Sequence, residues 1–143
     1  MEINKNDKLF EADSYSIARK AVEVLIEKRA LDVRMYKVDE SSSITDYYVN
    51  ATGRSSLNTT ALAGYVTDKL SELGVDERHI EGRSAGAWIL VDYGDVIVNV
   101  FDRESREFYN FDRLMPENSE VDISDIISDV DQKLKVNNNI KED

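Results

Sequence analysis

The chain has 143 residues, enough for one domain, and 41% of them are hydrophobic, which allows a modest core. Its 18 lysines and arginines are outnumbered by 29 aspartates and glutamates, and the formal charge of −11 disfavours direct nucleic-acid binding. The absence of cysteine excludes disulfides and thiolate metal sites, and no apolar run reaches the roughly 20 residues that span a bilayer. The polar N-terminus is unlike a signal peptide, so we expect a cytoplasmic protein without membrane contact. The acidic charge serves either solubility alone or a basic protein partner.

The first half of the chain is predicted to begin with a flexible arm at residues 1–12, followed by a helix and two strands. The helix starts at Asp13, because the apolar residues that follow recur at helical spacing. Alternating apolar residues predict a strand over 31–38, and β-branched and aromatic residues predict another over 45–52.

The central part is predicted to form a second helix and three more strands. A serine at 55–56 caps this helix, which ends at Gly74. A short strand near 78–81 follows, and then two strongly apolar strands over 87–93 and 96–101. This order predicts an α/β (α+β) single domain, with a mixed sheet of about five strands packed with helices.

The C-terminal part carries weaker signals. One further short strand is expected at 107–109, and Pro116 marks the end of a compact domain over 13–116. The remaining 117–143 forms an acidic extension with a disordered end. Within it, apolar residues at helical spacing predict an amphipathic helix over about 120–135 that either packs on the domain or binds a partner.

The stretch Gly82–Gly86 matches G-x-S-x-G, the nucleophile elbow of serine hydrolases, and raises the question of catalysis. An elbow serine follows a strand and precedes a helix, whereas Ser84 is followed at once by a strand. The single histidine, His79, precedes Ser84, and one histidine is too few for a zinc site. We therefore predict that the motif is a turn, with no catalytic and no metal-binding residues.

The stretch TGRSSLN over 52–58 supports an alternative function. A strand, a glycine, serines and a helix start make a plausible anion cradle, as in nucleotidyltransferases. Those enzymes also hold catalytic metals with closely spaced acidic residues on the following strand, and the strands here offer no such pair. Helix capping explains the stretch, and a nucleotide-binding or nucleotidyltransferase-type enzyme stays as the alternative.

The pair Gly94-Asp95 between two apolar runs predicts a two-residue hairpin, which fixes the strand register. One face of this hairpin is wholly apolar and is expected to meet the core helices: Tyr93, Val91, Ile89, Val96, Val98 and Val100. The other face mixes apolar and polar residues: Trp88, Leu90, Phe101 and Ile97 with Asp92 and Asn99. Such a mixed face suits protein binding, a covering helix (the C-terminal helix being one candidate) or a homodimer contact.

Several motifs in one order resemble the ribosomal silencing factor (RsfS, or Iojap) family, over about residues 12–115. The segments are ALDVRMYKVDESSSITDYYVNATGRSS, KLSELGV, IEG and AWILVDYGDVIVNVFDRESREFYNFDRL. The pattern W-x-L-x-DYGD-x-x-V-x-x-F followed by REFY is the most specific part.

The resemblance implies a fold related to nucleotidyltransferases without their catalytic acids, and a protein without enzymatic activity or cofactor. It implies a translation inhibitor that binds the large ribosomal subunit through ribosomal protein fourteen and sterically blocks subunit joining. Because the mixed hairpin face could also pair with its copy, we expect a monomer or weak homodimer. By motif, it assigns partner binding to nine residues: Asp46, Tyr47, Trp88, Leu90, Asp92, Tyr93, Asp95, Ile97 and Asn99. Asn99 stands where the family commonly has histidine, and the extension after Pro116 is longer than the family's usual ending.

Overall fold

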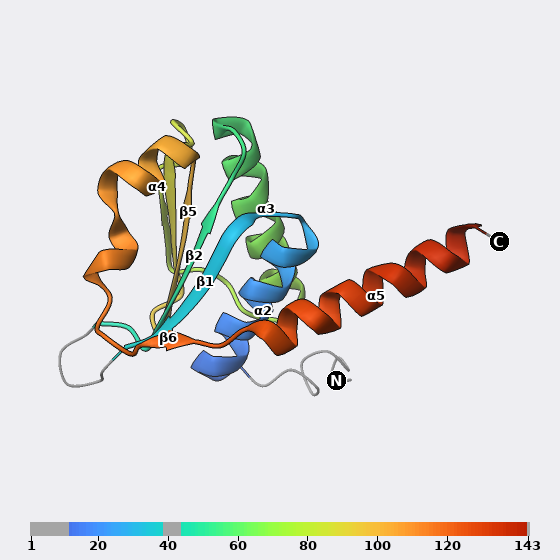
Figure 1. Cartoon of the computed structure of the whole chain (residues 1–143). Helices are drawn as coiled ribbons and strands as arrows, with labels where there is room; N and C mark the ends of the chain where they lie inside the picture. Colours follow the sequence, from blue (N-terminus) through green and yellow to red (C-terminus); the bar gives the residue numbers. More distant parts are fainter. Residues whose placement is uncertain (1–11, 39–43, 143) are drawn as a thin grey trace, which may run out of the picture.

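The computed structural model describes residues 12–38 and 44–142, which form one mixed sheet with helices on both sides (Figure 1). The expected arm lies outside the described residues, apart from Ala12. The elements in chain order are α2 (Ser14–Glu27), β1 (Leu31–Lys37), β2 (Tyr47–Thr52), α3 (Ser56–Glu72), β3 (His79–Glu81), β4 (Trp88–Asp92), β5 (Val96–Phe101), α4 (Arg103–Tyr109), the 3-10 helix η1 (Phe111–Leu114), β6 (Glu120–Val121) and α5 (Ser124–Glu142). The predicted α+β class with a mixed sheet is confirmed.

The sheet has six strands in the order β3-β4-β5-β2-β1-β6, one more than the five indicated by the sequence. The additional strand is β6, a short piece of the chain after Pro116 that pairs antiparallel with β1. β2 and β5 run parallel, whereas the other neighbouring strands in the sheet are antiparallel. The carboxyl ends of β2 and β5 therefore meet at one edge, where the Gly53 amide donates to the Phe101 carbonyl at 2.7 Å.

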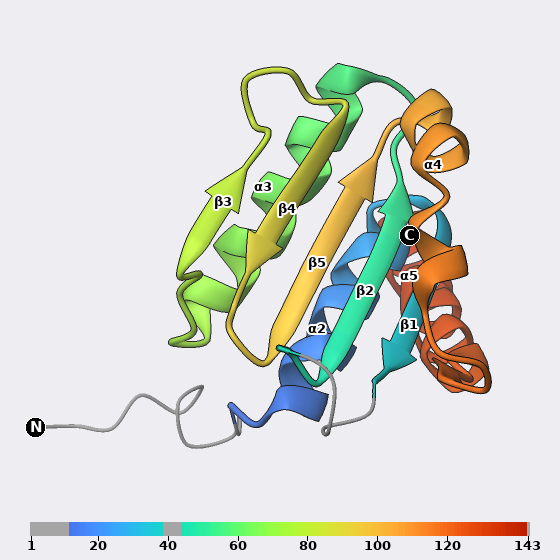
Figure 2. The same cartoon turned by 90° about the vertical axis from the view of Figure 1, so that its left-hand side faces the viewer.

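Helices α2 and α3 cover one face of the sheet and build the core with it (Figure 2). Leu25 of α2 and Leu62 of α3 are fully buried there with Val91 and Val98 of the hairpin. The hairpin face that the sequence predicted to be core lies on this side in full. Each of these buried aliphatic side chains contributes about 1.5 to 3 kcal/mol.

The predicted starts of both core helices are confirmed by their caps. The Asp13 carboxylate accepts from the Ser16 amide at 2.7 Å, and the Ser55 hydroxyl accepts from the Asn58 amide at 3.0 Å. Each cap satisfies an amide that has no partner within its helix. Gly74 follows α3 with φ of +87°, a conformation that favours glycine.

The short strand expected at 107–109 is wrong, because these residues lie in α4. The Asp102 carboxylate accepts from the Ser105 amide at 2.8 Å and starts the helix. Asn110, in the left-handed region with φ of 46°, ends it. A local cap therefore overrides the β-propensity of the aromatic pair Phe108-Tyr109.

α5 begins later than the predicted 120–135 helix, since Glu120 and Val121 belong to β6, and it continues to Glu142. The Asp122 carboxylate accepts from the Ser124 amide at 2.9 Å, close to the start of α5. Ile126 and Val130 are buried against the core, and the far half of α5 extends away from the sheet (Figure 1).

Candidate partner-binding face

The face of the sheet opposite α2 and α3 holds most of the predicted site, and we call it the open face. It consists of alternate residues from three adjacent strands: Trp88, Leu90 and Asp92 of β4, Ile97, Asn99 and Phe101 of β5, and Tyr48, Asn50 and Thr52 of β2. The predicted hairpin register is confirmed, with Trp88 opposite Phe101 and Leu90 opposite Asn99. Gly94 supplies the turn with φ of +88°.

One half of the open face lies under α4 and η1, and we call it the covered half. The Trp88 ring lies 5.0 Å from the Phe101 ring, 4.9 Å from Tyr109 and 5.9 Å from Phe111, measured between centroids. Trp88 is consequently half-buried. The helix that covers it is α4 with η1, not the C-terminal helix considered from the sequence.

A chain of side-chain hydrogen bonds crosses three strands beneath this cover. The Trp88 indole donates to the Asn99 carbonyl oxygen at 2.9 Å, and the Asn99 amide donates to Asn50 Oδ1 at 3.1 Å. The Asn50 amide in turn donates to Asp112 of η1 at 3.0 Å. Asn99 and Asn50 are fully buried, so this pairing satisfies amide groups that would otherwise be costly to bury.

Asp112 is where the hydrogen-bond chain meets α4. Arg106 Nε donates to Asp112 Oδ2 at 2.6 Å, and the Tyr36 hydroxyl donates to Asp112 Oδ1 at 2.9 Å. Burial opposes ionisation of Asp112, but the hydrogen bonds from Arg106 and Asn50 outweigh it and hold its pKa below the ordinary value. Burial, and then the bond to Asp112, raise the pKa of Tyr36 to about 12. A charge-assisted network therefore fastens η1 and α4 to the sheet.

The other half of the open face is rimmed by carboxylates, and we call it the acidic half. It contains half-buried Leu90, the buried Ile97, and the carboxylates of Asp92, Asp46 and Asp95. Half-buried Tyr48 lies at the border with the covered half, because its ring centroid is 5.3 Å from that of Phe111 of η1. The Asp95 carbonyl accepts from the amides of Asp46 and Tyr47 at 2.9 and 3.1 Å, which joins the hairpin turn to the start of β2. Burial, and then the charge of Asp92, raise the pKa of Tyr48.

Two of the nine predicted residues lie on the opposite side of the sheet. Tyr47 and Tyr93 are 6% and 8% exposed and belong to the core beside α2 and α3. The Tyr93 hydroxyl is buried without a hydrogen-bond partner in the described part of the chain, and burial, then Glu77 and Asp76, raise its pKa. The fold thus brings five predicted residues onto the open face and Asp46 and Asp95 to its rim, and separates these two tyrosines from them.

Beside Trp88, α4 and η1 carry exposed apolar side chains that the sequence prediction did not include. Phe108, Tyr109 and Leu114 are 78%, 52% and 73% exposed, and we call them the apolar ridge. Tyr109 links the ridge to the open face, because its ring contacts both Trp88 and Phe108. The residues after Asp102 have a spacing that also fits a helix, whereas the sequence prediction placed a strand at 107–109.

The stretch 52–58 forms a helix cap and not an open cradle. The Asn58 side chain accepts from the Arg54 amide at 2.9 Å, and the Ser55 hydroxyl accepts from the Asn58 amide. A Cβ on Gly53 would lie 2.6 Å from the Thr59 methyl group, so the glycine permits close packing at the helix start. The backbone amides of Arg54 and Asn58, which an anion would need as donors, therefore already donate to side chains of the same segment.

Ser84 lies in an exposed turn bounded by Gly82 and Gly86, both with positive φ. The Thr59 hydroxyl donates to the Gly86 carbonyl and ties this turn to α3. His79 Nε2 lies 2.8 Å from Glu81 Oε1, within its own strand. In the residues that the structure describes, no group of three or more His, Cys, Asp or Glu side chains could hold a metal ion.

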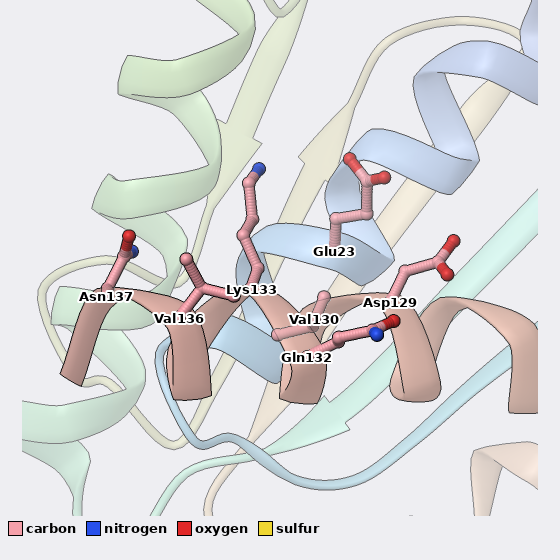
Figure 3. Close-up of a pocket in the computed structure, with 7 residues that line it drawn as sticks. All are labelled: Glu23, Asp129, Val130, Gln132, Lys133, Val136 and Asn137. Atoms are coloured by element: carbon pink, nitrogen blue, oxygen red, sulfur yellow. The ribbon is translucent and has the colours of Figure 1, made fainter. Parts of the chain in front are cut away.

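A groove of about 470 Å³ lies between α2 and α5 (Figure 3). Its lining combines Glu23 of α2 with Asp129, Val130, Lys133 and Val136 of α5. It belongs to the helical side of the molecule, away from the open face. Over residues 12–38 and 44–142, no helix is both long and apolar enough to cross a membrane.

These features define a small α+β domain whose sheet is packed by helices on one face and only half covered on the other. The family model described as "Ribosomal silencing factor during starvation" matches residues 11–143. The chain belongs to the ribosomal silencing factor family. The match includes the extension after Pro116, which the resemblance seen in the sequence did not cover.

Named relatives and solved structures agree with this assignment. Ribosomal silencing factor RsfS of Bacillus subtilis is 33% identical over 99 residues, covering 69% of this chain and 84% of the relative. The mouse protein named "Mitochondrial assembly of ribosomal large subunit protein 1" is 28% identical over 96 residues, covering 65% of this chain and 42% of that protein. A crystal structure of a Chromobacterium violaceum protein, 31% identical, superposes with a TM-score of 0.69 and covers 78% of this chain and 96% of its own.

Proposed function

We propose that this chain binds large-subunit ribosomal protein fourteen through the open face and thereby blocks joining of the ribosomal subunits. Membership of the ribosomal silencing factor family supports action at the ribosome. The name of the mouse relative, which refers to the large ribosomal subunit, supports that subunit as the partner.

The observation that carries the proposal is the composition of the acidic half and the adjoining ridge. Leu90 offers apolar contact area in the half that carries the carboxylates of Asp46, Asp92 and Asp95, and Phe108 offers more on the ridge. Ribosomal proteins are basic because they bind RNA, so a carboxylate rim gives them a complementary field. Apolar anchors within a charged rim are the usual arrangement of a protein-binding surface.

Inhibition by this route is steric and uses no reactive group. A bound domain occupies the surface that the small subunit needs, and no bond in either partner is made or broken. The self-capped segment at 52–58 and the exposed Ser84 turn agree with a protein that is not an enzyme.

The test compares two apolar residues of similar exposure, one on the ridge and one on α3. Phe108, on the ridge, is 78% exposed, and Leu57, at the start of α3, is 80% exposed. We expect Phe108→Ala to weaken binding to purified ribosomal protein fourteen and to large subunits by about tenfold, the effect of losing an aromatic anchor. Leu57→Ala is expected to leave binding to isolated ribosomal protein fourteen unchanged.

Binding is measured by calorimetry and by co-sedimentation, and subunit joining by light scattering. The parent protein at saturation is expected to prevent joining, and its affinity should fall with salt. Failure of the parent to bind isolated protein fourteen at low salt, or normal joining of saturated large subunits, would contradict the proposal.

A further inference from the structure

Four arginines lie at one edge of the sheet, three in separate loops and one at the first position of α4. This is the edge where the parallel strands β2 and β5 end, and where β4 and β1 begin. The four follow or precede strands at this edge, and we call them the arginine edge: Arg29, Arg54, Arg83 and Arg103.

Hydrogen bonds and close packing connect these segments to one another. Arg54 Nη1 donates to the Arg29 carbonyl at 2.7 Å, which places the Arg54 side chain on the turn before β1. The 82–86 turn packs on the start of α3, since a Cβ on Gly86 would lie 2.6 Å from the Ser56 carbonyl oxygen. The Asp102 amide donates to the Ala87 carbonyl at 2.9 Å and brings Arg103 beside the same turn.

The charges of the arginine edge are available to a partner. All four side chains are exposed, and none forms an ion pair with a carboxylate in the part of the chain that the structure describes. Nearby carboxylates are already engaged: Asp32 pairs with Arg34 and Arg106, Asp102 caps α4, and Glu81 lies against His79. Glu104 follows Arg103 in the first turn of α4, and Glu107 lines the same cleft as Arg103, so these two carboxylates bound the edge on the α4 side.

The opposite edge of the sheet has the opposite charge. Asp46 and Asp95 meet there through a backbone hydrogen bond of 2.9 Å. Asp13, Asp76 and Glu77 lie near the same edge, and their charges act on Tyr47 and Tyr93. Arg78, whose guanidinium lies beside Gly94, and Lys37, opposite Tyr47, also lie at this edge, but the carboxylates outnumber them. The two edges therefore differ in their charge, although the formal net charge of the whole chain is −11.

We propose that the arginine edge contacts phosphate groups of ribosomal RNA when the open face is bound to the large subunit. The inference rests on the proposed function and adds a second contact to it. A guanidinium presents a planar fork of donors that fits phosphate oxygens, and phosphate contacts fix orientation without reading sequence. RNA repels the opposite edge, which carries Asp46 and Asp95, and attracts the arginine edge. The two edges together therefore set the orientation in which the protein docks.

The first test removes two arginines that make no described hydrogen bond, Arg83→Ala together with Arg103→Ala. Its matched control removes two exposed lysines of α5, away from both edges, Lys133→Ala together with Lys135→Ala. We expect the double arginine variant to bind isolated large subunits more weakly than the parent. Its log affinity should also fall less steeply with log salt concentration, with a slope smaller in magnitude by about 0.7 to 0.9 for each lost phosphate contact. The lysine pair is expected to keep the slope of the parent, and equal slopes in all three proteins would overturn the proposal.

The second test uses the absence of cysteine in the chain, which allows one unique label per variant. Arg83→Cys and Asp95→Cys are each coupled to a maleimide photo-crosslinker and irradiated on large subunits. We expect the label at 83 to be recovered on ribosomal RNA and the label at 95 on a ribosomal protein.

The two labels separate the possible failures. A label at 83 that reaches only protein, or nothing, while the label at 95 reaches protein, overturns the RNA contact and leaves the proposed function intact. Absence of any co-sedimentation by the unlabelled parent contradicts the proposed function, and the RNA contact with it.

Discussion

The two halves of the open face use alternate residues of the same strands for different purposes. In the covered half, Trp88 and Asn99 are engaged by aromatic rings and by the Asp112 network. In the acidic half, Asp95 is exposed and Asp46 and Leu90 are half-buried, and neither carboxylate has a described ion-pair partner. Position in a binding motif therefore does not make a residue a binding residue, because a polar residue can serve to hold the neighbouring anchor.

Asn99 shows this difference most clearly. The resemblance assigns it to partner binding, yet its side chain is fully buried and both of its polar atoms are occupied. We infer that it acts on a partner through Trp88, whose indole it orients. Changes in the covered half should consequently reduce stability first, whereas changes in the acidic half should act on binding alone.

The largest expected effect is that of Asp112→Ala in the covered half. The substitution leaves Arg106, whose side chain is 10% exposed, and the Asn50 amide without their shared acceptor. We expect the free energy of unfolding to fall by about 3 to 5 kcal/mol, the usual result of breaking a buried ion pair from one side. Urea denaturation measures it, with Asp95→Ala as a control expected to change stability by less than about 0.5 kcal/mol.

The stability that Asp112 contributes should depend on pH. Because the folded state lowers the pKa of Asp112, its ionised form stabilises the fold above the ordinary value of 3.8, and this stability is lost as the pH falls below it. The gap in unfolding free energy between the parent and Asp112→Asn should therefore narrow on acidification below 3.8. A gap that widens there, or an Asp112→Ala loss below about 1 kcal/mol, would remove the distinction between the halves.

A smaller effect is expected from Asn99→His, which introduces the residue common in the family. A neutral imidazole keeps one acceptor for Trp88 and one donor for Asn50, so the cost near neutral pH is about 1 kcal/mol or less. Asn99→Leu supplies neither and is expected to cost about 2 to 3 kcal/mol. Fluorescence of Trp88, the single tryptophan, reports both transitions.

Acidification separates the histidine variant from the parent. A protonated imidazole has two donors and no acceptor, so it cannot receive the Trp88 indole hydrogen bond. Asn99→His should lose stability between about pH 7 and pH 5, a range in which the parent network does not titrate. Equal stability of the leucine and histidine variants at neutral pH would show that the polar pairing contributes little.

Local sequence signals predicted the parts of this fold that depend on near neighbours. The Gly94-Asp95 turn determines the hairpin register, and strict alternation then determines which residues share a face. Asp13 and Ser55 were recognisable as caps because their partners are three residues away. The same alternation identifies Tyr48 as a residue of the open face, since its neighbour Tyr47 points to the core.

The features that were missed depend on packing between distant segments. The hydrogen-bond chain joins Asn50 and Asn99, far apart in sequence, to Asp112 on another element. The sequence shows no cationic stretch longer than the pair at 28–29, because the arginine edge is assembled from three loops and the start of α4. Composition alone indicated that RNA is repelled, and only the fold shows that the charge is divided between two edges.

The smallest expected effect belongs to the acidic rim, tested with Asp46→Asn combined with Asp95→Asn. Both carboxylates are accessible and neither has a described ion-pair partner, so the fold should keep its stability. Rim charges steer encounter more than they hold a complex, so association with ribosomal protein fourteen at low salt should slow by about threefold with little change in dissociation. Asp68→Asn combined with Asp131→Asn, which removes the same charge from helices, should bind at the parental rate in stopped-flow measurements. If both double variants slow association equally, the rate depends on net charge alone, and the result contradicts the proposal that the acidic half faces the partner.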